Sequence, residues 1–298
     1  MNSGSVSLAS DGSHVSQYDP AATRQLLGEA GRLIRGVGFS GAHLTFIGGL
    51  VPMLLVPILD PGIEPHVGSG DIDLCLSIAL TSGEVGAYER IERALRELGY
   101  KMKPQGGRAA SSWQWVGGSK VSVTVEFFCA QVAQNKPGTL YRPAGDVTKG
   151  LSALTLATGA LVDRDLVEVK VEVDLPDGER TTLPFRVTAP AAFLASKSDA
   201  LARRSKNKDP YDIVWICEGW PGGQKALADV VRRSPIWDEP AMQGALRDLR
   251  GQFRGVDSLG ARAYARFLQP LRSTDLDTRS RRASGAVLAL LDADALNN

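Results

Sequence analysis

The stretch GGLVPMLLVPILDPGIEPHVGSGDID, from Gly48 to Asp73, decides the fold expected for this chain. Its last residues open a run, DIDLCLSIAL, whose first four positions alternate polar and apolar side chains, as a β-strand does. Successive side chains of a strand point to opposite faces, so Asp71 and Asp73 share one face while Ile72 and Leu74 share the other. The sequence therefore predicts a strand that carries two neighbouring carboxylates.

This carboxylate pair has two interpretations. Two adjacent carboxylates repel each other unless a cation lies between them, and Mg²⁺ prefers one or two carboxylates together with water and substrate phosphates. A surface strand with two solvated acids is the plain alternative, because an Asp-x-Asp pattern is common. Three neighbouring features favour a metal: the Gly48–Gly49 pair, the hydroxyl of Ser69 and a later cluster of lysine and acids. We therefore expect Asp71 and Asp73 to bind Mg²⁺, with Mn²⁺ as an alternative ion.

The Gly48–Gly49 pair follows a short predicted strand at residues 43–47. Glycine lets a backbone approach a phosphate closely and exposes its amide groups. A simple strand-to-helix turn would explain the pair equally well. Phosphate binding is therefore the functional hypothesis for these two residues, and the turn is the structural one.

A third metal-binding carboxylate is expected from a later strand. The run VSVTVEFFC, residues 121–129, places Glu126 on the polar face of a predicted strand. Glu126 is a ligand candidate if this strand lies beside the aspartate strand, and a solvent-facing acid otherwise. Glu172 and Asp174 are lesser candidates, since they alternate along a predicted hairpin that turns at Pro-Asp-Gly, residues 176–178.

A predicted helix that begins at Pro190 carries a lysine on its apolar stripe. Lys197 falls between Leu194 and Leu201 at helical spacing. A lysine there must reach the surface or find a partner, because burying an unpaired charge is costly. We expect a phosphate or carboxylate beside it.

The helix after it is predicted to begin at Asp209, with Pro210 in its first turn, so Asp209 is expected to act as its N-cap. Asp212 lies on the same face one turn later. Between the two helices lies a basic loop that contains Arg203, Arg204, Lys206 and Lys208.

Composition indicates a globular protein without a dominant charge. The 298 residues are 43% hydrophobic and 22% charged, with a net charge of +1, so a nucleic-acid contact would need a local basic patch. The three cysteines lie far apart in apolar runs, which is typical of reduced core residues. No signal peptide and no membrane-spanning run is recognised, so we expect a cytoplasmic protein.

The domain organisation follows from the order of predicted elements. Residues 1–18 are expected to be disordered, residues 19–188 to form an α/β domain with a small mixed β-sheet, and residues 189–298 to form a mainly α-helical domain. The helical part is rich in arginine, which suggests a polyanionic partner. These arginines are Arg232, Arg233, Arg247, Arg250, Arg254, Arg262, Arg266 and Arg272.

The combination of a Gly-Gly pair, a Ser-x-Asp-x-Asp strand, a lysine helix and the run KDPYD at residues 208–212 resembles nucleotidyltransferase toxins of the AbiEii and MenT type. These belong to the DNA-polymerase-β-like nucleotidyltransferase superfamily. The resemblance covers roughly residues 46–216. Two features differ from many members: Leu50 replaces a serine after the glycines, and a proline-rich insertion lengthens the spacing from Gly49 to Asp71.

The resemblance implies an activity and a set of site residues. The aspartate pair would bind Mg²⁺, the glycines and serine would hold the triphosphate of a nucleoside triphosphate (NTP), and the helix lysine and later aspartate would be needed for catalysis. Lys197 and Asp212 would then face the aspartate pair across a cleft between the two domains. The positions carried over are Gly48, Gly49, Ser69, Asp71, Asp73, Lys197, Asp209 and Asp212.

The resemblance also implies partners. The acceptor of the transferred nucleotide would be the 3′ end of tRNA, with a pyrimidine nucleotide added so that translation stops, and a cognate antitoxin would accompany the toxin. Transfer to a small molecule, as in antibiotic nucleotidyltransferases, is the alternative. A non-catalytic protein that binds nucleotide or a partner is a second alternative.

Overall fold

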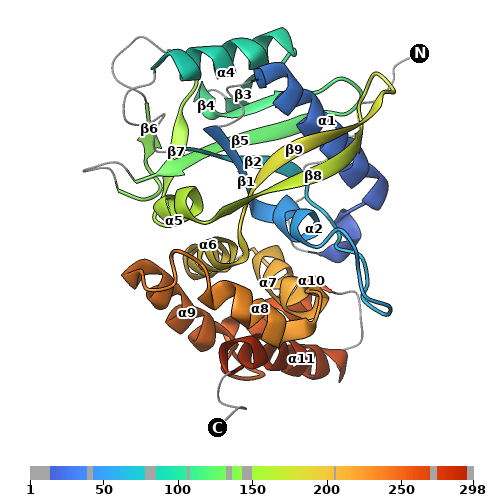
Figure 1. The fold of residues 1–298 in the computed structure, drawn as a ribbon, viewed down its shortest axis with the longest axis vertical. Coiled ribbons are helices and arrows are strands. Elements are labelled where there is room, and N and C mark those ends of the chain that lie inside the picture. The colour runs from blue at the N-terminus through green and yellow to red at the C-terminus, as the bar shows by residue number, and fades with distance from the viewer. Residues whose placement is uncertain are drawn as a thin grey trace. The chain divides into compact units, whose positions relative to one another are not determined.

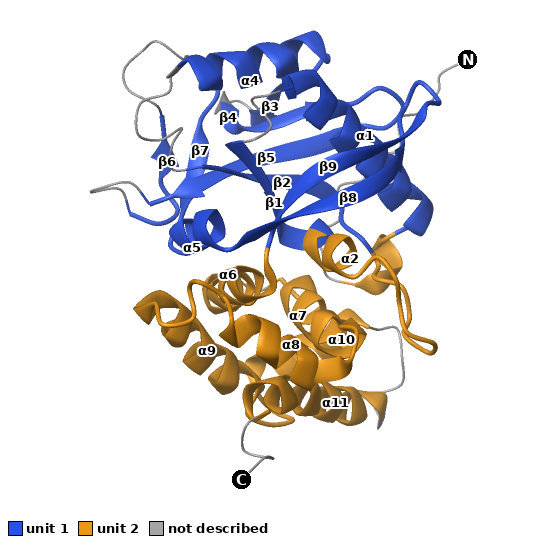
Figure 2. Cartoon of the chain, viewed as in Figure 1, with its two compact units in different colours: residues 1–9, 19–50, 68–188 blue, residues 10–18, 51–67, 189–298 orange. Residues whose placement is uncertain are grey.

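The computed structural model describes residues 14–38, 43–77, 85–105, 108–131, 136–142, 150–204, 206–268 and 274–293. Figure 1 shows the chain, and Figure 2 shows the two compact units into which it divides. Unit 1 contains residues 19–50 and 68–188, and unit 2 contains residues 10–18, 51–67 and 189–298. The segment 51–67 therefore belongs with the helices of unit 2, although it lies between two parts of unit 1 in the sequence.

Unit 1 is built on a mixed sheet, in which seven strands follow the order β3-β4-β5-β2-β1-β9-β8. Strand β7 pairs with β5, and β6 pairs with β7. With nine strands among the described residues, the sheet is larger than the small sheet expected, because residues 140–156 contribute two strands and the predicted hairpin joins the same sheet. The strands are β1 (Leu44–Ile47), β2 (Asp71–Leu76), β3 (Lys101–Gln105), β4 (Arg108–Gly117), β5 (Val123–Ala130), β6 (Leu140–Tyr141), β7 (Ala153–Leu156), β8 (Leu166–Asp174) and β9 (Arg180–Thr188).

The centre of the sheet confirms the predicted alternation of side chains. Strand β2 runs antiparallel to β1 and parallel to β5. Ile72 and Leu74 of β2 are fully buried, as are Val125 and Phe127 of β5. The polar side chains between them point to the opposite face, which is where the candidate site lies.

The helices and short turns of unit 1 are α1 (Pro20–Val37), η3 (Gly48–Leu50), α4 (Val85–Glu97) and α5 (Gly159–Arg164). Helix α1 begins where Asp19 accepts a hydrogen bond from the Ala21 amide, and it packs on α4 and β8. Gly28 permits this close packing, because a Cβ there would collide with the carbonyl oxygen of Asp174.

Unit 2 is helical. Helix α7 is its centre, since it packs against α2, α6, α8, α10 and α11. None of the described helices is long and apolar enough to span a membrane. The elements of unit 2 are η1 (Val15–Gln17), α2 (Val51–Leu55), α6 (Pro190–Arg203), α7 (Lys208–Gly219), α8 (Gly223–Arg232), α9 (Pro240–Phe253), α10 (Leu259–Phe267) and α11 (Thr274–Leu291).

Two features of unit 2 differ from the sequence expectation or extend it. Most of the N-terminal tail, residues 1–13, lies outside the described residues, but Val15–Gln17 forms a short 3₁₀ helix. Val51–Leu55 forms a helical turn within the proline-rich stretch, with Pro52 in the first turn, where its missing N–H costs no hydrogen bond.

Candidate active site

Three carboxylates meet on the polar face of the sheet in unit 1. Asp71 and Asp73 come from β2, and Glu126 comes from the neighbouring parallel strand β5, directly opposite Asp73. One oxygen from each carboxylate lies within 4.8 Å of the other two, and all three residues are partly buried. The sequence made Glu126 a ligand candidate if its strand lay beside the aspartate strand. Strand β5 does pair with β2, so Glu126 lies beside the aspartate pair.

This acidic cluster suits a small divalent cation. Oxygen ligands at about 2.0–2.1 Å from Mg²⁺ lie roughly 3–4 Å from one another. The separations in the cluster are close to this range, so small side-chain movements would bring all three oxygens onto one ion. Without a cation, three carboxylates this close would repel one another. The donor set, made only of carboxylate oxygens, is the one that Mg²⁺ or Mn²⁺ prefers.

Two polar side chains orient the carboxylates. The Ser69 hydroxyl donates to Asp71 Oδ1 at 2.8 Å, and the Gln114 side-chain amide on β4 donates to Glu126 Oε1 at 2.7 Å. Each hydrogen bond occupies one oxygen lone pair and fixes the direction of the others. Outer contacts of this kind commonly hold metal ligands in place.

Gly48 makes room for the carboxylate of Asp73. Its φ of +73° lies in the left-handed region that glycine adopts readily, and a Cβ at this position would collide with Asp73 Oδ2. The glycine pair of the sequence therefore begins the turn η3 beside the acidic cluster. Gly48 thus lies close to the carboxylate of Asp73, whereas the sequence suggested that its backbone would approach a phosphate.

The lesser candidates for a third ligand lie elsewhere. Glu172 and Asp174 are on β8, from which β2 is separated by β9 and β1. Both side chains are well exposed and pair with Arg180, at 3.8 Å and 2.7 Å. Glu126 is thus the acid that the fold brings to the aspartate pair.

Lys197 and the two later aspartates form a buried ion network in unit 2. The Lys197 Nζ donates to Asp209 Oδ1 at 2.9 Å and forms an ion pair with Asp212 Oδ2 at 2.6 Å. Only 7% of the Lys197 side chain is exposed, and Asp212 is fully buried. Burial opposes the ammonium charge, but the two carboxylates outweigh it and hold the pKa of Lys197 above its ordinary value. The partner expected for Lys197 is thus a pair of carboxylates.

Asp212 has two further partners. Lys208 Nζ donates to Asp212 Oδ1 at 2.6 Å, and His66 Nε2 lies 2.9 Å from the same oxygen. Burial opposes the ionised form of Asp212, yet Lys197 and Lys208 hold its pKa below the ordinary value. An ionised carboxylate only accepts hydrogen bonds, so His66 Nε2 carries the proton and donates it. Burial lowers the pKa of His66 to about 4, so the ring is neutral near pH 7.

Asp209 does not cap its helix, which corrects the sequence expectation. Helix α7 begins at Lys208, and Asn207 occupies the N-cap position without a side-chain cap bond. The Asp209 carboxylate instead accepts two hydrogen bonds from the guanidinium of Arg204, at 2.9 Å and 3.0 Å, besides the one from Lys197. Its oxygens are drawn to these cations, which satisfy a buried carboxylate better than one backbone amide would.

Residues 64–67, which precede Ser69 in the sequence, contact helix α7 through hydrogen bonds and aromatic packing. The carbonyl of Glu64 accepts a hydrogen bond from Trp215 Nε1 at 2.9 Å, and the amide of Val67 donates to the Tyr211 hydroxyl at 3.2 Å. The His66 ring packs against Tyr211 and Trp215, with ring centroids 5.2 Å and 5.0 Å apart. With the bond to Asp212, contacts from two adjacent turns of α7 hold residues 64–67 on this helix.

Comparison with known proteins identifies the family. A family model described as "Nucleotidyl transferase AbiEii toxin, Type IV TA system" matches residues 33–289, which is most of the chain. The chain belongs to the AbiEii family. The resemblance seen in the sequence is thereby confirmed, and the family is one of nucleotidyltransferase toxins of toxin–antitoxin systems. No curated protein matches the chain.

The AbiEii match spans every site residue that the sequence suggested. The structure gathers these residues into two groups, the acidic cluster with Gly48, Gly49 and Ser69 in unit 1, and the ion network in unit 2. The sequence did not indicate a role for His66 or the hydrogen bond from Gln114 to Glu126. It placed Arg204 and Lys208 in a basic loop, but not as the partners of Asp209 and Asp212. A lone histidine three residues before Ser69 was the only available signal for His66.

Proposed function

We propose that this AbiEii-family protein transfers a nucleoside monophosphate from an NTP to a hydroxyl of an RNA acceptor, with release of pyrophosphate. The observation that carries the proposal is the cluster of Asp71, Asp73 and Glu126 in a member of a nucleotidyltransferase family. The cluster would hold Mg²⁺, or Mn²⁺ in its place. Such a cation supplies activation of an attacking hydroxyl and neutralisation of phosphate charge.

The residues around the cluster have distinct roles in this proposal. Asp71 and Asp73 bind the cation, with Glu126 as the third ligand. Ser69 orients Asp71 through its hydrogen bond and, with the backbone of Gly48 and Gly49, contacts the triphosphate. A binding site of this kind would place the α-phosphorus in a fixed orientation for in-line attack, which is most of what an enzyme contributes to phosphoryl transfer.

The resemblance implies that the ion network of unit 2 is needed for activity. Lys197 and Asp212 would be needed for activity, with Asp209 as a neighbour. Because the ammonium of Lys197 already pairs with two carboxylates, we assign it first to holding Asp209 and Asp212 in place. The network contains three cations, Arg204, Lys197 and Lys208, against two carboxylates, so it retains one positive charge.

The 3′ end of tRNA is the first candidate for the acceptor, with a pyrimidine NTP as donor. Modification there would block translation, which accords with the toxin description of the family, and a cognate antitoxin would be the natural partner. The arginine-rich helices of unit 2 also favour a polyanionic acceptor.

The test is a labelling reaction. Purified protein is incubated with Mg²⁺, total tRNA and each of the four α-labelled NTPs in turn. We expect label on tRNA with one or two of the nucleotides, and none with Asp71→Asn. Glu172→Gln is the matched control, since it removes an exposed acid of the same sheet that lies far from the cluster in strand order.

The other outcomes distinguish the alternatives. Nucleotide binding without label on RNA would move the assignment to a small-molecule acceptor. Absence of NTP binding in the presence of Mg²⁺ would contradict the nucleotidyltransferase proposal and leave a protein that acts through a partner. Label that persists in Asp71→Asn would contradict the role of the acidic cluster.

A further inference from the structure

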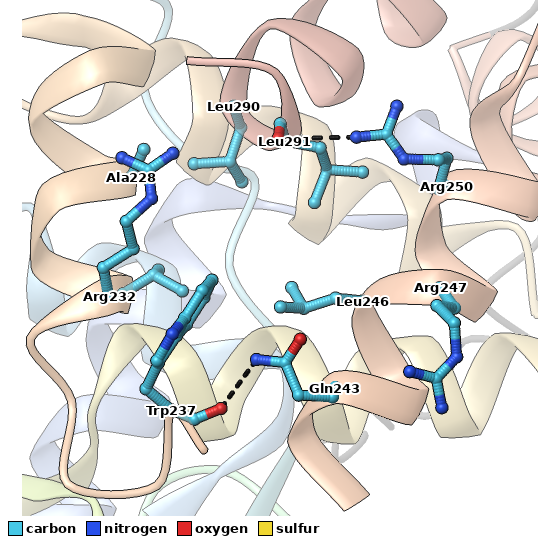
Figure 3. Close-up of a pocket in the computed structure, with 10 residues that line it drawn as sticks. Ala228, Arg232, Trp237, Gln243, Leu246, Arg247, Arg250, Leu290 and Leu291 are labelled. Atoms are coloured by element: carbon cyan, nitrogen blue, oxygen red, sulfur yellow. Dashed lines mark hydrogen bonds between the residues drawn. The ribbon is translucent and has the colours of Figure 1, made fainter. Parts of the chain in front are cut away.

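Unit 2 contains a pocket that the proposed reaction does not use. It lies between α8, the turn that follows α8, α9 and the end of α11, and has a volume of about 230 Å³ (Figure 3). Its apolar wall is made by Trp237, Leu246, Leu290 and Leu291. Sites for drug-sized ligands usually measure about 300–1,000 Å³. This pocket is smaller, so it suits one planar ring or one side chain.

The backbone at Trp237 is held by two hydrogen bonds. Its carbonyl accepts a hydrogen bond from the Gln243 side chain at 2.7 Å, and its amide donates to the carbonyl of Ser234 at 3.0 Å. The indole is only partly buried and faces the hollow (Figure 3). A partly exposed tryptophan offers a flat surface at little cost in conformational entropy, because only two side-chain torsions need to be ordered.

Three arginines surround the apolar wall, Arg232 from α8 and Arg247 and Arg250 from α9 (Figure 3). Arg250 bonds to Asp292 at 2.6 Å, and Arg232 pairs with Asp229 at 3.6 Å. Arg247 is exposed and makes no ion pair with any residue in the described part of the chain. The pocket therefore combines an aromatic wall with one uncompensated cation on its rim.

Several other arginines of unit 2 are paired with acids. Arg262 is held between Asp257 and Asp277, each at 2.5 Å, and Arg282 pairs with Glu218. The structure neutralises only part of the basic face that the sequence suggested. Arg232, Arg250 and Arg262 pair with acids, whereas four others make no ion pair with a described residue, namely Arg233, Arg247, Arg254 and Arg266; Arg272 lies outside the described residues. Unpaired positive charge therefore remains at several places in unit 2, and at the rim of this pocket it lies beside an aromatic wall.

We infer that the pocket binds one nucleotide of a single-stranded RNA, with the base against Trp237 and a neighbouring phosphate at Arg247. This inference rests on the proposed RNA acceptor and adds an anchoring point for it. Stacking on an aromatic side chain beside a basic group is the usual way in which proteins hold single strands without reading their sequence. Guanidinium groups also match phosphate oxygens in geometry.

An acidic peptide of a protein partner is the competing occupant. An apolar side chain of such a peptide, inserted into the pocket, would remove water from three guanidinium groups, two of which already pair with acids. A single carboxylate of the peptide would neutralise the charge of only one of them. A nucleic-acid strand carries a phosphate at every nucleotide. One phosphate can pair with a guanidinium group at the pocket while the other phosphates of the strand remain in water. The charge around the hollow therefore favours nucleic acid.

The test measures binding of a fluorescein-labelled single-stranded RNA of about 12 nucleotides, a length within the usual site sizes of single-strand binders. Fluorescence anisotropy is recorded with full-length protein in EDTA and without NTP, so that the reading is independent of catalysis. We expect Trp237→Ala to weaken binding by roughly 5- to 100-fold, as when other base-stacking aromatics are removed, and Trp237→Phe to retain most of it.

Arg247→Ala is the second variant, and its side chain is exposed, so the fold should not depend on it. We expect the slope of log K against log salt to become shallower by about 0.7, the value for one phosphate contact to a single strand. Arg281→Ala is the matched control. Arg281 is exposed on α11, about 14 Å along the helix from Leu290, and should leave binding unchanged.

The outcomes separate this inference from the proposed function. Unchanged RNA binding in both Trp237→Ala and Arg247→Ala overturns the inference, even if the wild type labels tRNA. Pocket-dependent RNA binding by a protein that transfers no nucleotide supports the inference and contradicts the proposed function. Binding of an acidic, tryptophan-containing peptide in place of RNA, lost in the same variants, assigns the pocket to a protein partner and overturns the inference.

Discussion

Asp73 and Glu126 lie directly opposite each other on two parallel strands whose segments are some 50 residues apart in the sequence. This pairing turns an aspartate pair into a three-carboxylate cluster. Because Gln114 orients Glu126, loss of either residue should weaken metal binding.

We expect Gln114→Leu to weaken Mn²⁺ binding by about 10- to 100-fold, the range for residues that position metal ligands, and Glu126→Gln to weaken it at least as much. Isothermal titration with Mn²⁺ measures the effect. Glu172→Gln serves as control and should bind as the wild type does. Equal affinities in Glu126→Gln and the wild type would remove Glu126 from the proposed ligand set.

Gly48→Ala should abolish nucleotide transfer. The new methyl group would push the Asp73 carboxylate out of the cluster, in addition to a strain of about 1–2 kcal/mol from a positive φ. Gly178→Ala is the matched control in the same unit, because Gly178 has a φ of +96° but no atom within 4 Å of the added Cβ. We expect it to lose stability only. Activity assays and urea unfolding of both variants separate strain from displacement of Asp73.

Lys197→Met should destabilise the protein by about 3–5 kcal/mol, because it leaves the carboxylates of Asp209 and Asp212 buried with one cation fewer. Arg203→Met, on the same helix, breaks an exposed pair with Asp199 and should cost at most about 1 kcal/mol. Urea denaturation at constant pH measures both. A stable Lys197→Met protein that loses only NTP affinity would indicate that the lysine binds phosphate directly.

Acidification should destabilise the protein through His66. Burial lowers the pKa of this ring from 6.5 to about 4, so between these values the unfolded chain binds the additional proton and the folded protein does not. Stability therefore falls as the pH is lowered through this window. The depressed pKa values of Asp209 and Asp212 act only at lower pH, below the ordinary value of 3.8.

The expected loss from His66 is about 2 kcal/mol between roughly pH 7 and pH 5. Urea unfolding at the two pH values measures it. In His66→Gln, which retains a side-chain amide donor for Asp212, this difference should shrink. A difference of the same size in both proteins would mean that other groups cause it.

Local patterns predicted the elements well and their pairing poorly. The alternation around Asp71 and around Glu126 predicted two strands with acids on one face, and both strands are present. Whether β2 and β5 are neighbours depends on the whole sheet order, which no local pattern encodes. Glu126 therefore remained a conditional candidate until the register was known.

The ion network shows the same limit. The stripe around Lys197 indicated that a partner was needed, which the structure bears out. The Asp-Pro pair at residues 209–210 suggested an N-cap, but the nearby cations determine where the carboxylate points. His66 lies 146 residues from Asp212 in the sequence, so its hydrogen bond could be found only in three dimensions.

The assignment of residues 51–67 to unit 2 restricts how this protein can be cut or rearranged. A fragment that begins at residue 189 would lack the segment that covers Tyr211 and Trp215 and donates to Asp212. It would expose aromatic surface and leave a buried acid short of a partner. The helical unit therefore has no contiguous gene segment of its own, and a recombination event that exchanges it between relatives must carry both pieces together.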